Sequence, residues 1–385
     1  MSLSVLNILS VALNETPKIS AFPGFCKRVR FRKSNCQRCV EICPENVISL
    51  NPGPTINNGC SNCDLCLNVC PTEVFQNNIY TDQYLINQGK SFLGKGQRQG
   101  GKKRLSIHCH QAENQNEHSL SVPCLGRITE NIILGVVLSG FDEVELRQGL
   151  CSQCRFRQGE KLLKNSIVAS RILLESMMGL GCFTMGIKEK EKKNEAMLSR
   201  REIFSKISSK VKDQAESFVY QKVIREKLTG DPENKKTKWL SPKRELLKKL
   251  LRQKGWENST ITKYNPELPW GKIKMDEKNC SACGICLALC PTGAISKKLE
   301  DGCHFLYFNS SLCTNCSLCK EACPENSIDF EENFVLSDIF EDRAKIVARI
   351  KLTSCMICGE ILAAGKGEFC PTCQKRQVWP MQLKT

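Results

Sequence analysis

The chain has 385 residues, of which 26 are cysteine, and its 56 Lys and Arg against 40 Asp and Glu give a formal net charge of +16. This length allows two or three compact domains. The cysteines fall in C-x2-C groups rather than in scattered pairs, which favours metal ligands in a reducing cytoplasm over a secreted disulfide framework. No stretch approaches the roughly eighteen apolar residues of a membrane span, so we expect a soluble protein.

Residues 1–25 begin with MSLSVLNILSVAL, which is apolar but short. It lacks a basic leading segment and a convincing cleavage site, so it does not indicate a secretory signal. Its apolar spacing predicts a docking helix through Leu3, Leu6, Ile8, Leu9 and Leu13.

Residues 26–75 contain two cysteine runs that each end in Cys-Pro. The second run reads C-x2-C-x2-C-x3-C-P in full, with Cys60, Cys63, Cys66 and Cys70. The first run keeps only its last three cysteines, Cys36, Cys39 and Cys43. Lys33 stands at its first position, and Cys26 lies ten residues before Cys36. Between the runs, VISLNPGPTINNG predicts two short strands joined by a Pro/Gly turn.

We expect residues 76–104 to form a polar helix and then a Gly-rich basic linker. Residues 105–186 predict a small α/β domain. Strands are predicted at LSIHC, SLSVPC and VELRQG. Helical spacing of apolar residues is present in RITENIILGVVLSGF and KLLKNSIVASRILLESMM. Cysteines stand at the ends of the predicted strands, where α/β sheets place their sites. These candidate ligands are Cys109, Cys124, Cys151 and Cys154.

The run PCLGRITENIILGVVLSGFDEVELRQGLC resembles the small iron–sulfur subunit of methyl-viologen-reducing hydrogenases. There, a C-x-G-R turn precedes a helix, and a later cysteine pair follows a strand. The resemblance implies a [2Fe–2S] electron carrier held by the four central cysteines. A zinc site that includes His108 or His110, or a domain with metal-free thiols, are the alternatives. Cys182 and Cys303 are interpreted as structural thiols.

Residues 187–270 are predicted to form a basic helical arm. Residues 188–254 hold 21 Lys and Arg against 10 Asp and Glu. One long amphipathic helix is predicted from the spacing of Ile203, Ile207, Val211, Ala215, Phe218 and Val223. Ser241 and Pro242 then predict the cap and first turn of a second helix, which carries Leu246, Leu247, Leu250 and Leu251.

We interpret this arm as a solvated helical linker packed on the chain's own domains, with docking of an acidic redox partner as the alternative. Nucleic-acid binding is disfavoured, because Phe204, Phe218 and Tyr220 lie on or beside the apolar stripe rather than among the basic residues. The net charge does not favour it either. Four cubanes and two smaller four-thiolate sites would remove roughly twelve positive charges from the total.

Residues 271–332 contain the complete cysteine run twice, as CSACGICLALCP and CTNCSLCKEACP. The doubled run resembles bacterial two-cluster ferredoxins, in which each [4Fe–4S] cubane takes three cysteines from one run and the fourth from the other. The resemblance implies one cluster on Cys280, Cys283, Cys286 and Cys323. It implies a second cluster on Cys290, Cys313, Cys316 and Cys319.

Residues 26–75 then form a second ferredoxin-like unit, which makes four cubane sites in the chain. Because Lys33 replaces a ligand, the same rule leaves one cluster there with only Cys36, Cys39 and Cys70. Three thiolates suit either a [3Fe–4S] cluster or a cubane with a fourth ligand from elsewhere. Cys26 is the nearby spare thiol, and we expect it to complete a cubane.

Residues 333–385 are predicted to form a helix and a metal-binding tail. The tail carries two C-x2-C pairs, with Cys355, Cys358, Cys370 and Cys373 as the candidate ligands. The two short knuckles resemble a zinc ribbon, in which four thiolates surround one tetrahedral ion.

Together, these patterns predict an α+β chain with two ferredoxin-like units, a small central α/β domain, a basic helical arm and a zinc-ribbon-like tail. Clusters held only by cysteine have no open coordination position, so they indicate electron transfer rather than bond chemistry. We expect a cytoplasmic polyferredoxin that relays low-potential electrons to or from a flavoprotein or hydrogenase-type reductase. The alternatives are an iron–sulfur and zinc regulatory or nucleic-acid-binding protein, or one component of a larger reductase.

Overall fold

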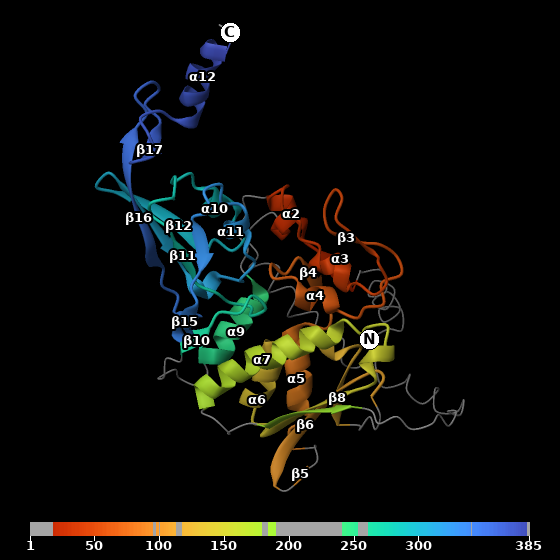
Figure 1. Cartoon of the computed structure of the whole chain (residues 1–385). Coiled ribbons are helices and arrows are strands. Elements are labelled where there is room, and N and C mark those ends of the chain that lie inside the picture. The colour runs from red at the N-terminus through yellow and green to blue at the C-terminus, as the bar shows by residue number, and fades with distance from the viewer. Residues whose placement is uncertain are drawn as a thin grey trace, which may run out of the picture.

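The computed structural model describes residues 18–94, 98–99, 101–112, 118–178, 184–189, 241–252, 261–339 and 341–382. Helices and strands are mixed throughout these residues, which confirms the α+β class (Figure 1). The predicted docking helix over residues 3–13, the long basic helix over 203–223 and Cys182 all lie outside the described residues.

An antiparallel pair of strands, β1 (Ile19–Ala21) and β4 (Phe75–Asn77), closes the N-terminal unit. The unit therefore extends over about 18–78 rather than 26–75. The strand pair expected between the two cysteine runs is confirmed as the hairpin of β2 (Ile48–Ser49) and β3 (Thr55–Ile56). The remaining elements of the unit are short: η1 (Pro23–Phe25), α2 (Lys27–Arg30), α3 (Arg38–Ile42) and α4 (Leu65–Val69).

A mostly parallel five-stranded sheet forms the centre of the molecule. The three predicted strands and both predicted helices are present. A further strand, β9, was not predicted, and it pairs with β8 where the basic arm was expected to begin. The strands are β5 (Arg98–Gln99), β6 (Lys102–Cys109), β7 (Ser119–Val122), β8 (Glu143–Gln148) and β9 (Thr184–Glu189). The helices are α6 (Glu130–Leu138) and α7 (Gly159–Met178).

The segment expected to be a linker, residues 76–104, belongs to this central unit. Its predicted helix is present as α5 (Asp82–Ser91), capped by Thr81, whose side chain accepts a hydrogen bond from the N–H of Tyr84. Leu85 and Ile86 on α5 are buried in the central core beside α6. The end of the segment is already strand β6. The linker prediction is therefore wrong, because a helix with a buried apolar side cannot serve as a free connection.

The described end of the basic arm is also part of the core. Helix α9 (Pro242–Arg252) begins as predicted, with the N–H of Arg244 donating to the Ser241 side chain at 3.0 Å. Leu247, Leu250 and Leu251 are buried against the central unit, and Trp270 further along the chain is fully buried there too. Helix α9 thus packs on the chain's own domains, as expected, but its apolar side belongs to the core and is not solvated.

The C-terminal unit repeats the plan of the N-terminal one. Strand β11 (Ile273–Met275) pairs with β14 (Ile328–Phe330), and two short helices, α10 (Ile285–Leu289) and α11 (Leu318–Glu321), follow its cysteine loops. Between the loops lies a long hairpin of β12 (Ile295–Glu300) and β13 (Cys303–Phe308).

The tail is joined to this unit by a continuous sheet rather than by a helix. Strand β16 (Lys345–Ser354) pairs with β13 on one side and β17 (Ile361–Ala363) on the other, so the tail extends away from the rest of the molecule (Figure 1). Before it, β15 (Asn333–Val335) pairs with β10 (Ile261–Lys263). The described helical elements of residues 333–385 are η7 (Leu336–Ile339) and α12 (Pro371–Gln382).

Candidate iron–sulfur and zinc sites

In the C-terminal unit, four cysteines from both runs line one small cavity: Cys280, Cys283, Cys286 and Cys323. Cys280 and Cys283 lie in the loop before α10, Cys286 lies in the first turn of α10, and Cys323 follows α11. Burial, together with the neighbouring thiols Cys280, Cys283 and Cys323, raises the pKa of Cys286 to about 12. Thiolates held this close repel one another, so the set suits a cationic core that would cancel the repulsion.

The other four cysteines of this unit form a second set: Cys290, Cys313, Cys316 and Cys319. Cys290 ends α10, Cys313 and Cys316 lie in the loop that leads into α11, and Cys319 lies within α11. Burial raises the pKa of Cys313 to about 12 and that of Cys316 to about 11, and Cys290 is among the thiols that add to both shifts. The two sets have the exchanged composition that the ferredoxin resemblance implies.

The N-terminal unit has one set of the same kind. Cys43, at the end of α3, joins Cys60, Cys63 and Cys66 around a small cavity. Burial raises the pKa of Cys60, and the nearby carboxylates Asp64 and Glu45 add to this effect. Both carboxylates are ion-paired, Asp64 with Arg127 at 3.3 Å and Glu45 with Arg155 at 3.3 Å.

Cys26 lies with the three cysteines that Lys33 leaves incomplete. Burial, followed by the thiols of Cys70, Cys26 and Cys36, raises the pKa of Cys39 to about 12. Cys26 is 8% exposed and stands at the start of α2, whereas Lys33 is exposed. The structure thus brings together Cys26, Cys36, Cys39 and Cys70.

Three of the four cysteine loops share a strained backbone. One residue on each side of the second cysteine has a positive φ, a conformation that costs energy without glycine. These residues are Asn62 and Asp64, Ala282 and Gly284, and Asn315 and Ser317. The strain directs backbone donors inward, as where the N–H of Asn315 donates to the Cys313 sulfur at 3.4 Å. In the fully described loop 33–39, no residue has a positive φ.

The turns that follow the fourth cysteine are alike in all four runs. The third residue after that cysteine always has a positive φ: Asn46, Glu73, Gly293 and Asn326. The first N-terminal run therefore keeps the local geometry of its crossing ligand and departs from the others only where Lys33 replaces cysteine.

In the central unit, the four candidate cysteines lie at the carboxyl ends of the parallel strands and line one cavity: Cys109, Cys124, Cys151 and Cys154. Burial raises the pKa of Cys124 to about 12, and the other three thiols contribute to the shift. Gly159, at the start of α7, allows this approach, because a Cβ there would lie 2.5 Å from the Cys124 sulfur.

The two central histidines have other partners. His108 is buried, and its Nδ1 lies 3.1 Å from the Ser119 hydroxyl. Since neighbours on a strand point to opposite faces, His108 faces away from Cys109. His110 lines the cysteine cavity, and its Nδ1 contacts the carbonyl of Pro123. The structure therefore favours an all-cysteine ligand set over one that includes His108.

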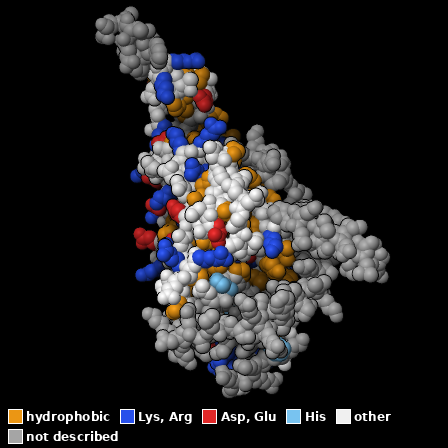
Figure 2. Space-filling view, turned by 90° about the vertical axis from the view of Figure 1, so that its right-hand side faces the viewer, with side chains coloured by type: hydrophobic (Ala, Val, Ile, Leu, Met, Phe, Trp, Pro, Cys, Tyr) orange, Lys and Arg blue, Asp and Glu red, His pale blue; other side chains and the backbone are white. Residues whose placement is uncertain are grey.

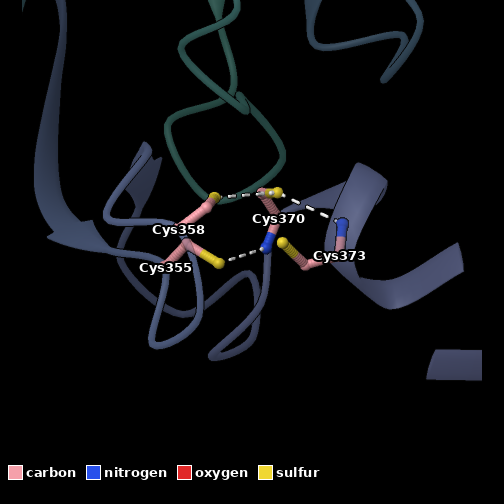
Figure 3. Close-up of side chains that lie close together, drawn as sticks. All are labelled: Cys355, Cys358, Cys370 and Cys373. Carbon is pink, nitrogen blue, oxygen red and sulfur yellow. Dashed lines mark hydrogen bonds between the residues drawn. The ribbon is translucent and has the colours of Figure 1, made fainter. Parts of the chain in front are cut away.

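The tail holds four sulfurs that converge on one point (Figure 3). These sulfurs, which all lie within 4.8 Å of one another, belong to Cys355, Cys358, Cys370 and Cys373. Among the described residues, no other group of three or more Cys, His, Asp or Glu side chains brings its ligand atoms this close together. A Zn–S bond of about 2.3 Å places the sulfurs of a tetrahedral site about 3.8 Å apart. The Cys358 and Cys370 sulfurs are 3.6 Å apart.

Backbone donors prepare this set for a metal ion. The N–H of Cys370 donates to the Cys355 sulfur at 3.2 Å, and the N–H groups of Cys358 and Cys370 lower the pKa of Cys355 to about 6. The Cys370 thiol, followed by burial and the other two thiols, raises the pKa of Cys373 to about 12, and a bound cation would relieve this crowding of thiolates. The tail cysteines therefore fit a single metal ion, while the other sets are more widely spaced, as a cluster of several irons requires.

The 4Fe-4S binding domain family model matches residues 273–296 and 306–329. The C-terminal unit therefore carries two adjacent copies of this domain, which imply [4Fe–4S] clusters and suggest an electron-transfer role. No curated protein matches the chain. Among the described residues, no helix is long and apolar enough to cross a membrane.

Several buried charged residues that contact these sites were not predicted. Arg30, Arg127 and Arg244 are each at most 6% exposed. Sequence patterns give no signal for them, because an arginine in a basic stretch is ordinarily solvated.

Proposed function

We propose that the chain is an iron–sulfur electron-transfer protein, with four cubanes, a [2Fe–2S] cluster on the central cysteines and one zinc ion in the tail. The observation that carries the proposal is that the five candidate cluster sets follow one another through direct protein contacts. All twenty candidate ligands of these sets are cysteines, so no coordination position is left open for a substrate.

The central set adjoins the N-terminal unit through Leu65, which stands between Cys63 and Cys66 and is fully buried. Its side chain lies 3.0 Å from where a Cβ on Gly159 would be, and Gly159 itself touches Cys124. The amide of Asn68 on α4 also donates to the carbonyl of Gly126 at 2.8 Å. Electrons would have a short packed path between these two sets.

The N-terminal and C-terminal units meet at α2, which begins beside Cys26. Lys27 forms a 2.8 Å ion pair with Glu321, and the Arg30 Nε donates to the carbonyl of Leu289 at 2.9 Å. Within each unit, the exchanged cysteines join the two sets. The proposed order is thus the central set, the two N-terminal sets and then the two C-terminal sets.

Cys283 is exposed, which leaves the last set of this order accessible to a protein partner. We propose a flavoprotein or hydrogenase-type reductase as the partner. On the face drawn in Figure 2, basic and acidic side chains are interspersed over the described part of the chain, which suits a protein contact better than a nucleic acid.

Anaerobic purification followed by iron, sulfide and zinc analysis tests this proposal. We expect about 18 irons per chain, one zinc and several reversible one-electron couples in a redox titration. A protein that binds nucleic acid tightly at physiological salt and has no reversible couples would contradict it.

A further inference from the structure

Two buried arginines from distant parts of the chain converge on the cysteine set made of Cys290, Cys313, Cys316 and Cys319, which we call the junction set. Arg30 comes from α2 of the N-terminal unit and is 6% exposed, and Arg244 comes from α9 and is 4% exposed. Both reach the backbone of the C-terminal unit from outside it, and Arg30 also donates to the carbonyl of Gly24 in its own unit at 3.0 Å.

Arg30 inserts its guanidinium at the end of α10. Its Nε donates to the carbonyl of Leu289 at 2.9 Å, and one Nη donates to those of Ala288 at 3.3 Å and Cys290 at 3.5 Å. The last carbonyls of a helix lack partners within the helix, so a cation fits there. The Arg30 charge is therefore held beside the backbone of Cys290, a candidate ligand.

Arg244 approaches the same set from helix α9. One Nη donates to the carbonyl of Cys313 at 2.5 Å and also contacts the carbonyl of Pro269. Burial lowers the pKa of Arg244, and the Cys313 thiol is the first group that opposes this shift. For Arg30, burial likewise lowers the pKa, and Cys290 and Cys316 oppose it.

The other C-terminal set, Cys280, Cys283, Cys286 and Cys323, has different surroundings. Its cavity is lined by Glu325 and by apolar and small polar residues, with no Lys or Arg among them. The amine of Lys297 lies 3.8 Å from where a Cβ on Gly284 would be, but this lysine is exposed. A charge in water is screened, whereas a buried one is screened much less.

We propose that Arg30 and Arg244 raise the reduction potential of the junction cluster above that of its partner in the same unit. This inference rests on the proposed electron-transfer function. Each reduction adds one electron to the cluster, and its added negative charge is stabilised by the two buried cations. The electron comes from the neighbouring N-terminal cluster, which is oxidised in the same step and is reduced again through the central set by a low-potential donor protein.

The test is a redox titration of the full chain with the clusters loaded, followed by electron paramagnetic resonance. In the unchanged protein, the junction cluster should have the higher potential of the C-terminal pair, and Cys319→Ser identifies its signal. Arg30→Met and Arg244→Met should each make reduction of the junction cluster at least tenfold less favourable. For one electron, this lowers its reduction potential by about 59 mV. The other clusters should keep their potentials.

Arg30→Lys and Arg244→Lys keep the positive charge. They should therefore lower the reduction potential of the junction cluster less than the methionine variants do. Arg32→Gln, at a nearby exposed position, should change nothing. Equal potentials in the methionine variants and the unchanged protein would overturn the inference and leave the proposed function intact. If a methionine variant loses iron, the test falls back on the unchanged protein. There, a junction cluster with a lower potential than the Cys280, Cys283, Cys286 and Cys323 cluster would overturn the inference. Absence of any reversible couple would instead overturn the proposed function.

Discussion

At the scale of single residues, Cys26 lies beside the three cysteines of the broken motif. In the loop around Cys36, no residue has the positive φ found in the other three loops. This is the loop in which Lys33 stands in place of the first cysteine. A thiol from the start of α2 lies beside the incomplete set instead. In a complete run the neighbouring cysteine is three positions away, whereas Cys26 reaches this set across a helix and a turn.

We predict that Cys26→Ser converts the cluster of Cys36, Cys39 and Cys70 from a cubane to a [3Fe–4S] cluster. The physical reason is the loss of one of four thiolate ligands. Iron analysis should show about one iron fewer per chain, and a new paramagnetic signal should appear in the oxidised protein.

Cys303→Ser is the matched control for this variant, because Cys303 is also buried but lies in strand β13 rather than in one of the cluster sets. It should leave the iron content unchanged. If Cys26→Ser also left the iron content and the spectra unchanged, Cys26 would not be a ligand.

At the scale of secondary-structure elements, Arg127 joins three of them. It lies in η2 (Leu125–Arg127), is 2% exposed, and forms ion pairs with Asp82 of α5 at 2.6 Å and with Asp64 before α4 at 3.3 Å. Burial opposes the charge of Arg127, but the two carboxylates raise its pKa above the ordinary value. Asp64 is also one of the left-handed residues of a cysteine loop. Arg127 therefore connects the central unit to the backbone of a proposed cluster site.

We predict that Arg127→Met lowers the free energy of unfolding by about 3–5 kcal/mol. The substitution leaves Asp64 and Asp82 buried without their shared cation. Urea unfolding of the loaded protein under anaerobic conditions measures the change. Arg157→Met, at an exposed position in the same unit, should stay within about 0.5 kcal/mol of the unchanged protein, and an equal effect of both variants would contradict the prediction.

At the scale of the whole molecule, the proposed metal sites fall into two separate groups. The five cluster sets are packed into one body, whereas the tail cysteines gather at the end of an extended sheet. Because β16 is shared with the C-terminal unit, the tail is anchored by strand pairing whether or not a metal is bound. Loss of the tail metal should therefore remain local.

We predict that Cys373→Ser abolishes zinc binding and leaves the iron content unchanged. A structural zinc site needs all four thiolates, and the tail supplies no other cysteine. Elemental analysis of the full chain measures both metals, and limited proteolysis should show faster cleavage after β16. Retained zinc, or a parallel loss of iron, would contradict this account of the tail.

Local sequence patterns were enough to predict several features of this structure. The ligand spacing of each cysteine loop, the strands and helices around Leu146 and Leu173, and the Ser241 cap depend on neighbours within a few residues, where covalent geometry and periodicity dominate. These features were therefore readable from the sequence. The pairing of Cys43 and Cys290 with cysteines of the other runs came from the ferredoxin resemblance.

Only the tertiary structure decided the remaining features, because each depends on residues far apart in the chain. Arg30 and Leu289 are 259 positions apart, and a buried arginine has the same letter as a solvated one. Strand β9 and helix α9 belong to the core only because they pack on β8 and α6, which lie far from them in the sequence. The sequence alone determined which chemistry the cysteines suit, while long-range packing decided which thiol stands beside the incomplete set and which cations surround the junction set.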